Sequence, residues 1–403
     1  MAIFCENMQN LPVVLEYSNT SLKLGYAGSI YPLFLSSSHY LSSSSQNKSK
    51  GVIKTLPHSL QKPVSNYVVK KIVENSYISN IDDFESIISS LFSERMAIED
   101  LTKHPILIVQ PPLSKTDQQK EIATMLFEKF NIPALHFVES HISAVYSQGK
   151  TTALALDMSE TAARISPVIE ARVKPQHVIQ SPLSGMAIKS EIKKVFQANN
   201  IDYTPYISGQ ASDSIDKSFD MFNINIEFEE FMKSMLEISP YPLSSGKLGH
   251  TIAMQYEFQS GATFSFSNER FSIPEIFFNP SQTGIQQNQQ SAHLASIPQL
   301  IASSLTMCDP SIRPLLASNF VLTGGLSLIR GFSNRLSSEF YQQTGHNLLK
   351  IKQSQNLGNT GYNVSACLPE YEAKSAGWIG GSMLGSMPQF LDICKNKSDF
   401  EEI

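Results

Sequence analysis

The sequence predicts an α/β protein with two duplicated lobes around a central cleft. Two strand–acid–turn–strand units carry this prediction. Residues 12–28 place Glu16 at the end of a first strand, and residues 153–168 place Asp157 at the equivalent position. A strand–turn–helix pattern follows each unit later in the chain, which indicates an internal duplication. The length of 403 residues also exceeds what one simple core supports, so we expect two lobes.

Composition and charge narrow the class of protein. With 41% hydrophobic and 17% charged residues, the chain has the apolar material for a sizeable core. The net charge of −5 argues against direct, broad electrostatic binding of nucleic acid. No apolar run approaches the roughly 20 residues of a membrane helix, and the first ten residues lack the features of a signal peptide. The cysteines form no Cys-x-x-Cys pair, which favours a reducing compartment over a zinc site or a disulfide framework: Cys5, Cys308, Cys367 and Cys394.

The first half continues the α/β pattern after its opening hairpin. Residues 34–50 are rich in serine and predict a mobile loop. Apolar residues at helical or strand spacing predict the elements that follow. These are a helix at 82–92, a strand at 106–109, a helix at 114–130 that Ser114 could cap, a strand at 135–138 and a short helix ending at Gly149.

The second half is organised around residues 319–332. Apolar residues 320–322 predict a short buried strand, Gly324 and Gly325 allow a tight turn, and helical spacing from Phe332 predicts a helix. Such a turn could bring backbone N–H groups close to a ligand, or it could pack a strand tightly against a helix. The remaining expectations are a Gln-rich loop at 281–291 and a closing helix that begins at Trp378.

Two lobes with an acid at each first hairpin suit a nucleotide that carries a divalent metal. The hairpin turns could hold phosphates on backbone N–H groups, and the carboxylates of Glu16 and Asp157 could hold the water shell of the metal. Alternatively, these acids and Lys23 are inherited polar residues in a cleft that no longer binds tightly. Three histidines lack a carboxylate at a telling spacing and are interpreted as structural: His104, His136 and His141.

Short motifs spread over nearly the whole chain resemble those of the actin family. They are LGYAG at 24–28, HPIL at 104–107, FEKFNIPA at 127–134, LTGG at 322–325 and WIGGS at 378–382. A finer resemblance points to the nuclear actin-related proteins of the fourth class, the actin-like subunits of SWI/SNF-type remodelling and related acetyltransferase complexes. The stretches that carry it are QSPLSG at 180–185, YEF at 256–258, ERFSIP at 269–274 and MCDPSIRP at 307–314. The resemblance implies the actin-like fold shared with Hsp70 and hexokinase.

The chain departs from actin where actin binds phosphate. Actin has Asp-Asn-Gly-Ser-Gly in its first phosphate turn and Asp-Ser-Gly-Asp-Gly in its second. Here residues 16–20 read EYSNT and residues 157–161 read DMSET, so both glycines are gone from each turn. The glutamine that orients the attacking water aligns with Ser140, and an adenosine-contacting glutamate aligns with Lys233. We therefore expect no ATP hydrolysis, and ATP with Mg²⁺ as a weakly bound ligand at most.

The resemblance assigns two sets of candidate site residues. A vestigial ATP cleft would comprise Glu16, Lys23, Asp157, Gly324 and Gly325. A partner groove would comprise Tyr146, Gly149, Thr151 and Ala171, which fall where actins line the cleft between their large lobes at the barbed end. We expect this groove to accept an amphipathic helix, although Tyr146 could also be an ordinary core residue. No catalytic residue and no metal ligand are assigned.

The resemblance also implies a domain division and a function. One lobe would comprise residues 1–152 and 353–403, and the other residues 153–352. The expected function is that of a nuclear, non-polymerising subunit of a SWI/SNF-type or RSC-type remodelling complex. It would dock on the helical region ahead of the ATPase motor, beside actin or a second actin-related protein. The alternatives are an actin-like ATPase, a cytoskeletal subunit of a dynein-activator complex, and a subunit of a histone acetyltransferase complex.

Overall fold

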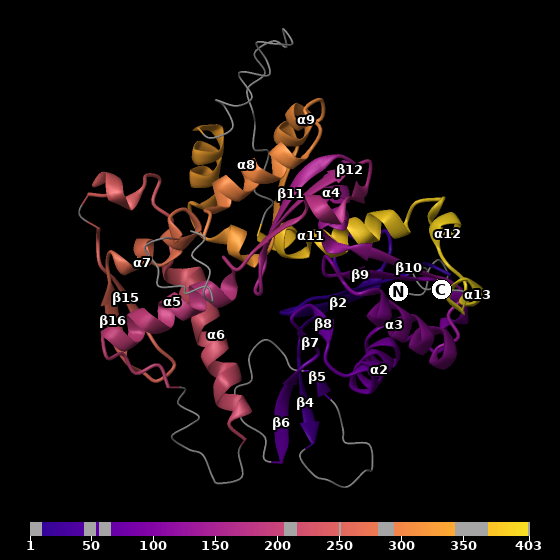
Figure 1. The fold of residues 1–403 in the computed structure, drawn as a ribbon. Helices are drawn as coiled ribbons and strands as arrows, with labels where there is room; N and C mark the ends of the chain where they lie inside the picture. Colours follow the sequence, from indigo (N-terminus) through magenta and orange to yellow (C-terminus); the bar gives the residue numbers. More distant parts are fainter. Residues whose placement is uncertain are drawn as a thin grey trace. The chain divides into compact units, whose positions relative to one another are not determined.

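A computed structural model of the chain describes residues 10–43, 54–55, 66–204, 216–249, 251–280, 294–342 and 370–401. The chain divides into two compact units (Figure 1). Unit 1 comprises Met1–Lys150, Ser212–Phe219 and Ser375–Ile403, and unit 2 comprises Thr151–Ala211 and Asp220–Lys374. Within the described residues, no helix is both long and apolar enough to cross a membrane.

Unit 1 is built on a five-stranded mixed sheet in the order β10-β9-β1-β2-β3. Its strands are β1 (Val13–Tyr17), β2 (Ser21–Tyr26), β3 (Phe34–Ser37), β9 (Ile106–Gln110) and β10 (Leu135–Glu139). β1 runs antiparallel to β2 and parallel to β9. Every residue of β1 and β9 is buried, which explains their continuous apolar runs, because parallel strands are covered on both faces.

Helices cover both faces of this sheet (Figure 1). The helices α2 (Ile81–Ser90) and α3 (Thr116–Lys129) contribute to the core on one face, and α4 (Ser140–Tyr146) to the core on the other. The predicted elements at 82–92, 106–109, 114–130 and 135–138 are thereby confirmed, and the short helix predicted to end at Gly149 is α4, which ends at Tyr146. Ser114 does not cap α3, because its hydroxyl donates to Pro111 O at 2.7 Å and Lys115 occupies the N-cap position.

The closing helix α11 (Glu370–Gly385) begins eight residues before Trp378, so that predicted start was wrong. Trp378 lies in its middle, fully buried, and the indole N–H donates to Val14 O at 3.2 Å. The glycines that follow Trp378 allow close packing. A methyl group on Gly380 would overlap the Ser143 carbonyl, and one on Gly381 would lie 2.6 Å from Val109 Cγ2. Small residues therefore let α11 lie directly on β1, β9 and α4.

The prediction of a mobile loop at 34–50 is wrong for residues 34–43, which form β3 and β4 (His39–Ser43). β4 pairs with β6 (Tyr67–Lys71) and with β5 (Lys54–Thr55). Ser38 is buried and its hydroxyl donates to Asn19 O at 2.6 Å, while the Tyr40 hydroxyl donates to Asp83 Oδ2 at 2.5 Å. These contacts order a serine-rich segment. Residues 44–50 and the Gln-rich stretch 281–291 lie outside the described residues.

Unit 2 repeats the strand arrangement of unit 1 in the order β13-β12-β11-β17, with β14 also paired to β12. The strands are β11 (Ala153–Met158), β12 (Ala163–Ile169), β13 (Arg172–Val173), β14 (Ile179–Ser181) and β17 (Phe320–Thr323). β11 runs antiparallel to β12 and parallel to β17, as β1 does to β2 and β9. The predicted equivalence of the two hairpins is confirmed.

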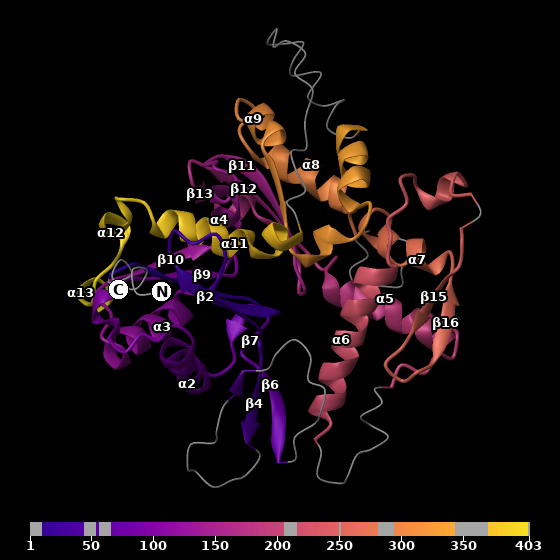
Figure 2. The same cartoon turned by 180° about the vertical axis from the view of Figure 1, so that it is seen from behind.

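A single apolar core holds the rest of unit 2 together. The helices α5 (Gly185–Ala198) and α6 (Ser218–Met235) lie beside the hairpin β15–β16 (Figures 1 and 2). Phe196 of α5 and Phe231 of α6 have ring centroids 5.0 Å apart, and both contact Phe266 of β16. Unit 1 also contains β7 (Val73–Glu74), β8 (Tyr77–Ile78), α12 (Phe390–Ile393) and α13 (Lys397–Glu401). Unit 2 also contains β15 (Met254–Glu257), β16 (Thr263–Phe266), α7 (Glu269–Ser272), α8 (Ile297–Met307), α9 (Arg313–Ser318) and a helix at 332–342.

Candidate functional site

Each hairpin places an acid on its first strand opposite a base on its second. In unit 1, Glu16 of β1 is in register with Lys23 of β2. In unit 2, Asp157 of β11 is in register with Arg164 of β12. The two acids therefore hold equivalent places, as the sequence predicts.

The acid of the first hairpin is neutralised by its own hairpin. Lys23 Nζ lies 2.9 Å from Glu16 Oε2, and the two residues are only 3% and 6% exposed. Gly377 of α11 leaves room for the same carboxylate, because a methyl group there would lie 3.0 Å from Glu16 Oε1. Ser140 also lies beside Gly377, since its Cβ would be 3.5 Å from that methyl group. The first hairpin thus contains a paired carboxylate enclosed by α11.

The turn of the first hairpin is held by the hydroxyl of Ser18. The backbone N–H groups of Thr20 and Ser21 donate to Ser18 Oγ at 3.4 and 3.0 Å, and Ser18 N donates to Ser21 O at 2.9 Å. The next turn of unit 1 supports it, because Ser76 N donates to Asn19 Oδ1 at 3.0 Å. The backbone N–H groups of Ser18, Thr20 and Ser21 are therefore already bonded within the turn.

The turn of the second hairpin is engaged by helix α5. Gly185 N donates to Ser159 O at 3.1 Å, and Met186 N donates to Glu160 O at 2.9 Å. The Glu160 carboxylate accepts from Lys189 Nζ at 2.8 Å, and Glu229 lies 3.3 Å from the same nitrogen. Burial alone would lower the pKa of Lys189, but the two carboxylates outweigh it and raise that pKa above its ordinary value. The start of α5 therefore already carries an internal anion.

The two glycines after β17 have different roles. Gly324 has φ +91°, and a methyl group there would overlap the Met158 carbonyl and lie 2.8 Å from Asp157 Oδ1. Tight packing on the second hairpin therefore requires glycine at 324. A methyl group on Gly325 would meet none of the described residues within 4 Å, so packing against them does not require glycine there.

The predicted groove residues fall into two local pairs. In unit 1, Tyr146 ends α4, its ring packs partly buried against the α4–α11 core, and Gly149 N donates to Tyr146 O at 2.8 Å. Gly149 is exposed with φ +64°, and nothing lies within 4 Å of a methyl group placed on it. In unit 2, Ala171 N donates to Thr151 O at 2.7 Å, and Ala171 itself has φ +62°.

The histidines are mostly structural, as expected. Nδ1 of His104 lies 2.8 Å from Leu11 O, and Nδ1 of His136 lies 3.1 Å from Ile393 O. His141 differs, because its buried Nε2 lies 3.2 Å from Glu139 Oε2. This carboxylate, only two residues before His141 in the chain, was not predicted as its partner from the sequence. Among the described residues, no group of three or more Asp, Glu, His or Cys side chains could hold a metal ion. Lys233, where actins have an adenosine-contacting glutamate, is exposed on α6.

Comparison with known proteins decides the family. The family model for actin matches residues 8–403. The chain belongs to the actin family. A relative named "SWI/SNF and RSC complexes subunit arp42", from Schizosaccharomyces pombe, is 24% identical over 98% of this chain and 97% of its own. "Actin-related protein 4" of Arabidopsis thaliana is 25% identical over 82% of this chain and 76% of its own. The protein of that name from Yarrowia lipolytica is 23% identical over 97% and 93%.

The finer resemblance is thereby confirmed, since these relatives belong to the actin-related proteins of the fourth class and to the subunits of SWI/SNF and RSC. The actin-like α/β fold is confirmed as well.

Proposed function

We propose that this protein is a structural subunit of an ATP-dependent chromatin-remodelling complex of the SWI/SNF or RSC type. The observation that carries the proposal is the match to the fission yeast subunit arp42, which extends over 98% of this chain and 97% of that one. Such end-to-end similarity supports a shared role more strongly than a match confined to one domain. A nuclear location follows from this proposal.

We propose further that the subunit does not hydrolyse ATP. Glu16 is already paired with Lys23, the turn amides of Thr20 and Ser21 donate to Ser18, and the second turn contacts α5. A phosphate at the first turn would have to displace bonds that the protein makes to itself. Ser140 has a hydroxyl where actins have the glutamine that orients water, which leaves the attacking water without its amide partner. ATP with Mg²⁺, if it binds, would bind weakly.

The partner we propose for the groove is the helical region ahead of the remodeller's motor domain, with actin or a second actin-related protein alongside. Tyr146 keeps part of its ring exposed at the end of α4, and Gly149 offers open space beside it. A large amphipathic ring next to a residue without a side chain suits the apolar face of a partner helix. A subunit that does not polymerise makes no contacts with copies of itself. Contact with the partner helix would take their place.

Affinity purification tests the proposal. The protein carrying a tag at its N-terminus would be expressed at its native level and purified after nuclease treatment, which removes partners bridged by DNA. Mass spectrometry of the eluate is expected to show a remodeller ATPase at an amount comparable to the tagged chain. Recovery of dynein-activator subunits, or of acetyltransferase subunits without any remodeller ATPase, would contradict the proposal.

A further inference from the structure

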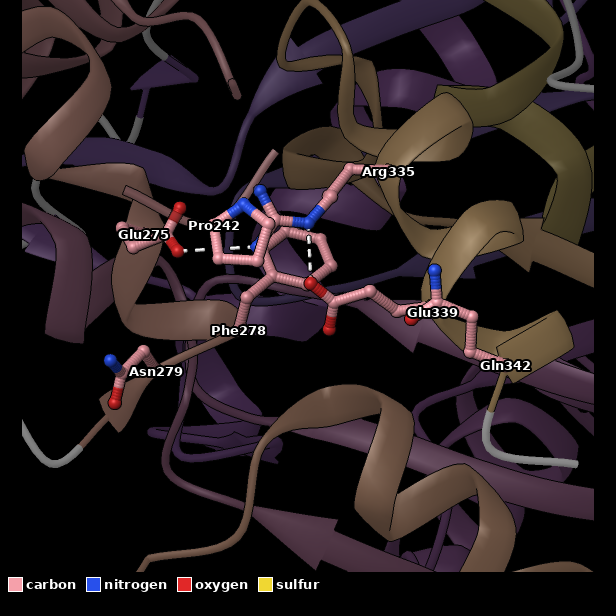
Figure 3. A pocket seen from close by; sticks show the side chains of 7 residues that line it. All are labelled: Pro242, Glu275, Phe278, Asn279, Arg335, Glu339 and Gln342. Atoms are coloured by element: carbon pink, nitrogen blue, oxygen red, sulfur yellow. Dashed lines mark hydrogen bonds and ion pairs between the residues drawn. The ribbon is translucent and has the colours of Figure 1, made fainter. Parts of the chain in front are cut away.

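Unit 2 contains a cavity of about 260 Å³ away from its hairpin turn (Figure 3). Its lining residues are Pro242, Glu275, Phe278, Asn279, Arg335, Glu339 and Gln342. The volume is below the roughly 300–1,000 Å³ of pockets that hold drug-sized ligands. The cavity is therefore sized for one side chain or for a ligand of similar bulk.

The wall of the cavity contains one buried cation, Arg335. Arg335 is 2% exposed, and its Nη1 donates to Ser239 O at 2.8 Å. Its Nη2 donates to Glu275 Oε1 at 3.2 Å, and its Nε donates to Glu339 Oε1. The guanidinium also lies 4.8 Å from the centroid of the Phe278 ring. Arg335 is thus fixed between the two carboxylates, and each of its side-chain nitrogens already donates to an oxygen.

One carboxylate oxygen beside this cation lacks a donor. Glu275 is only 4% exposed, and its buried Oε2 has no hydrogen-bond partner among the residues that the structure describes. Figure 3 shows one Glu275 oxygen joined to Arg335 and the other turned away from it. Glu339 likewise uses Oε1 for Arg335. Two carboxylates against one guanidinium leave the site with a formal charge of −1, and burial raises the pKa of Glu275. A buried carboxylate oxygen without a donor is destabilising, so the site is incomplete as a structural ion pair.

We propose that this cavity receives one positively charged side chain, lysine or arginine, from a basic segment of a partner protein. The cationic head would donate to Glu339 and, after a small side-chain shift, to the unpartnered oxygen of Glu275. The aliphatic stem would lie against Phe278 and Pro242, as long basic side chains commonly pack on apolar surface. The formal charge of −1 matches one positive charge better than a divalent metal, and it disfavours an anion. This inference does not depend on the proposed function.

The test uses the full-length protein and a fluorescein-labelled peptide of alternating glycine and lysine, followed by fluorescence anisotropy. The same peptide with every lysine acetylated is the chemical control, because acetylation removes the charge. Wild-type protein is expected to bind the lysine peptide and to bind the acetylated peptide at least tenfold more weakly. Equal binding of the two peptides would overturn the proposal.

Two substitutions locate the binding. Glu339→Gln removes one charge from the cavity and is expected to weaken binding at least fivefold. Glu99→Gln changes the net charge equally at an exposed site in unit 1 and is expected to leave binding unchanged. If both variants weaken binding alike, the attraction is non-specific and the proposal fails.

A gain-of-function variant keeps the test decisive if Glu339→Gln does not fold. Gln342 is exposed at the rim of the cavity, so Gln342→Glu adds a carboxylate without disturbing the core. It is expected to strengthen binding of the lysine peptide at least threefold, and unchanged or weaker binding would contradict the proposal. Competition with spermidine is the last measurement. If this free amine displaces the peptide at concentrations equal to the peptide's own, the occupant is a small amine and the peptide assignment is overturned.

Discussion

Lys23 donates to the carboxylate of Glu16 at 2.9 Å while both side chains are buried in the first hairpin of unit 1. In this actin-family chain, that ion pair lies beside a turn closed by the Ser18 hydroxyl. A buried ion pair of this kind is most consequential when only one partner is lost, because the other charge is then left without compensation in the protein interior. The pair therefore fixes the hairpin from within.

Lys23→Met is expected to destabilise the protein by about 3–5 kcal/mol, because it leaves Glu16 as an uncompensated buried charge. The double variant Glu16→Gln with Lys23→Met should recover much of that loss. Urea unfolding followed by circular dichroism measures the free energy of unfolding of each variant. Additive losses in the double variant would show that the two side chains do not act as a pair.

Gly324→Ala should lower the stability of the folded protein much more than Gly325→Ala. At Gly324 an alanine would adopt a left-handed backbone and overlap the Met158 carbonyl, and the backbone strain alone costs about 1–3 kcal/mol. At Gly325 an alanine meets open space, and we expect a change within about 0.5 kcal/mol. Differential scanning fluorimetry of the two purified variants compares them directly. Equal melting temperatures would contradict the packing role of Gly324.

Lys189 should make stability depend on pH at the alkaline end. Its pKa is raised above the ordinary 10.5, so the folded state holds this proton more tightly than the unfolded chain does. The stabilisation is therefore fully present below about pH 10.5 and is lost as the pH rises through the folded pKa. We expect the difference in unfolding free energy between wild type and Lys189→Met to be constant from pH 7 to 10 and to shrink above that range. A difference that grows with pH would refute this assignment.

Gly149→Trp should block docking of the partner helix. The backbone at Gly149 has φ +64°, a region that asparagine tolerates far better than tryptophan, so Gly149→Asn is the matched control for backbone strain. In a pull-down with the pre-motor helix of the remodeller, we expect that Gly149→Trp does not bind the helix and that Gly149→Asn does. The docking site lies elsewhere if the tryptophan variant is folded and binds as well as the control.

Tyr146→Ala tests the second groove residue of unit 1. If the exposed part of the ring is a hot spot, its truncation should weaken binding of the helix by about 1–3 kcal/mol. Tyr146→Phe keeps the ring and is expected to bind nearly as wild type, because the contact is mainly one of area. Calorimetric titration of the helix into each variant measures the affinity, and full binding by Tyr146→Ala would exclude Tyr146 from the interface.

The hairpins and their acids could be predicted from the sequence, because alternating or continuous apolar residues indicate strands directly. It mispredicted residues 34–43, since serine content alone suggests a loop. The contacts that order them, Ser38 with Asn19 and Tyr40 with Asp83, join residues 19 and 43 positions apart. Such long-range partners leave no local pattern in a single sequence.

The cavity in unit 2 was missed for the same reason. Arg335 and Glu275 are 60 residues apart, and neither lies in a motif that suggests a binding site. The pairing of Glu160 with Lys189 was also missed, although the loss of glycine from that turn was visible in the sequence. The sequence therefore located the altered turn, but only the structure identified the side chain that α5 holds there.

We propose that this actin-family chain keeps the actin fold while its hairpin turns do not support ATP hydrolysis. A single-turnover assay with radiolabelled ATP and Mg²⁺, using purified protein in excess over nucleotide, tests it most directly. The account predicts no release of phosphate above the background measured with heat-denatured protein. Release of phosphate at the rate of actin measured in parallel would contradict it.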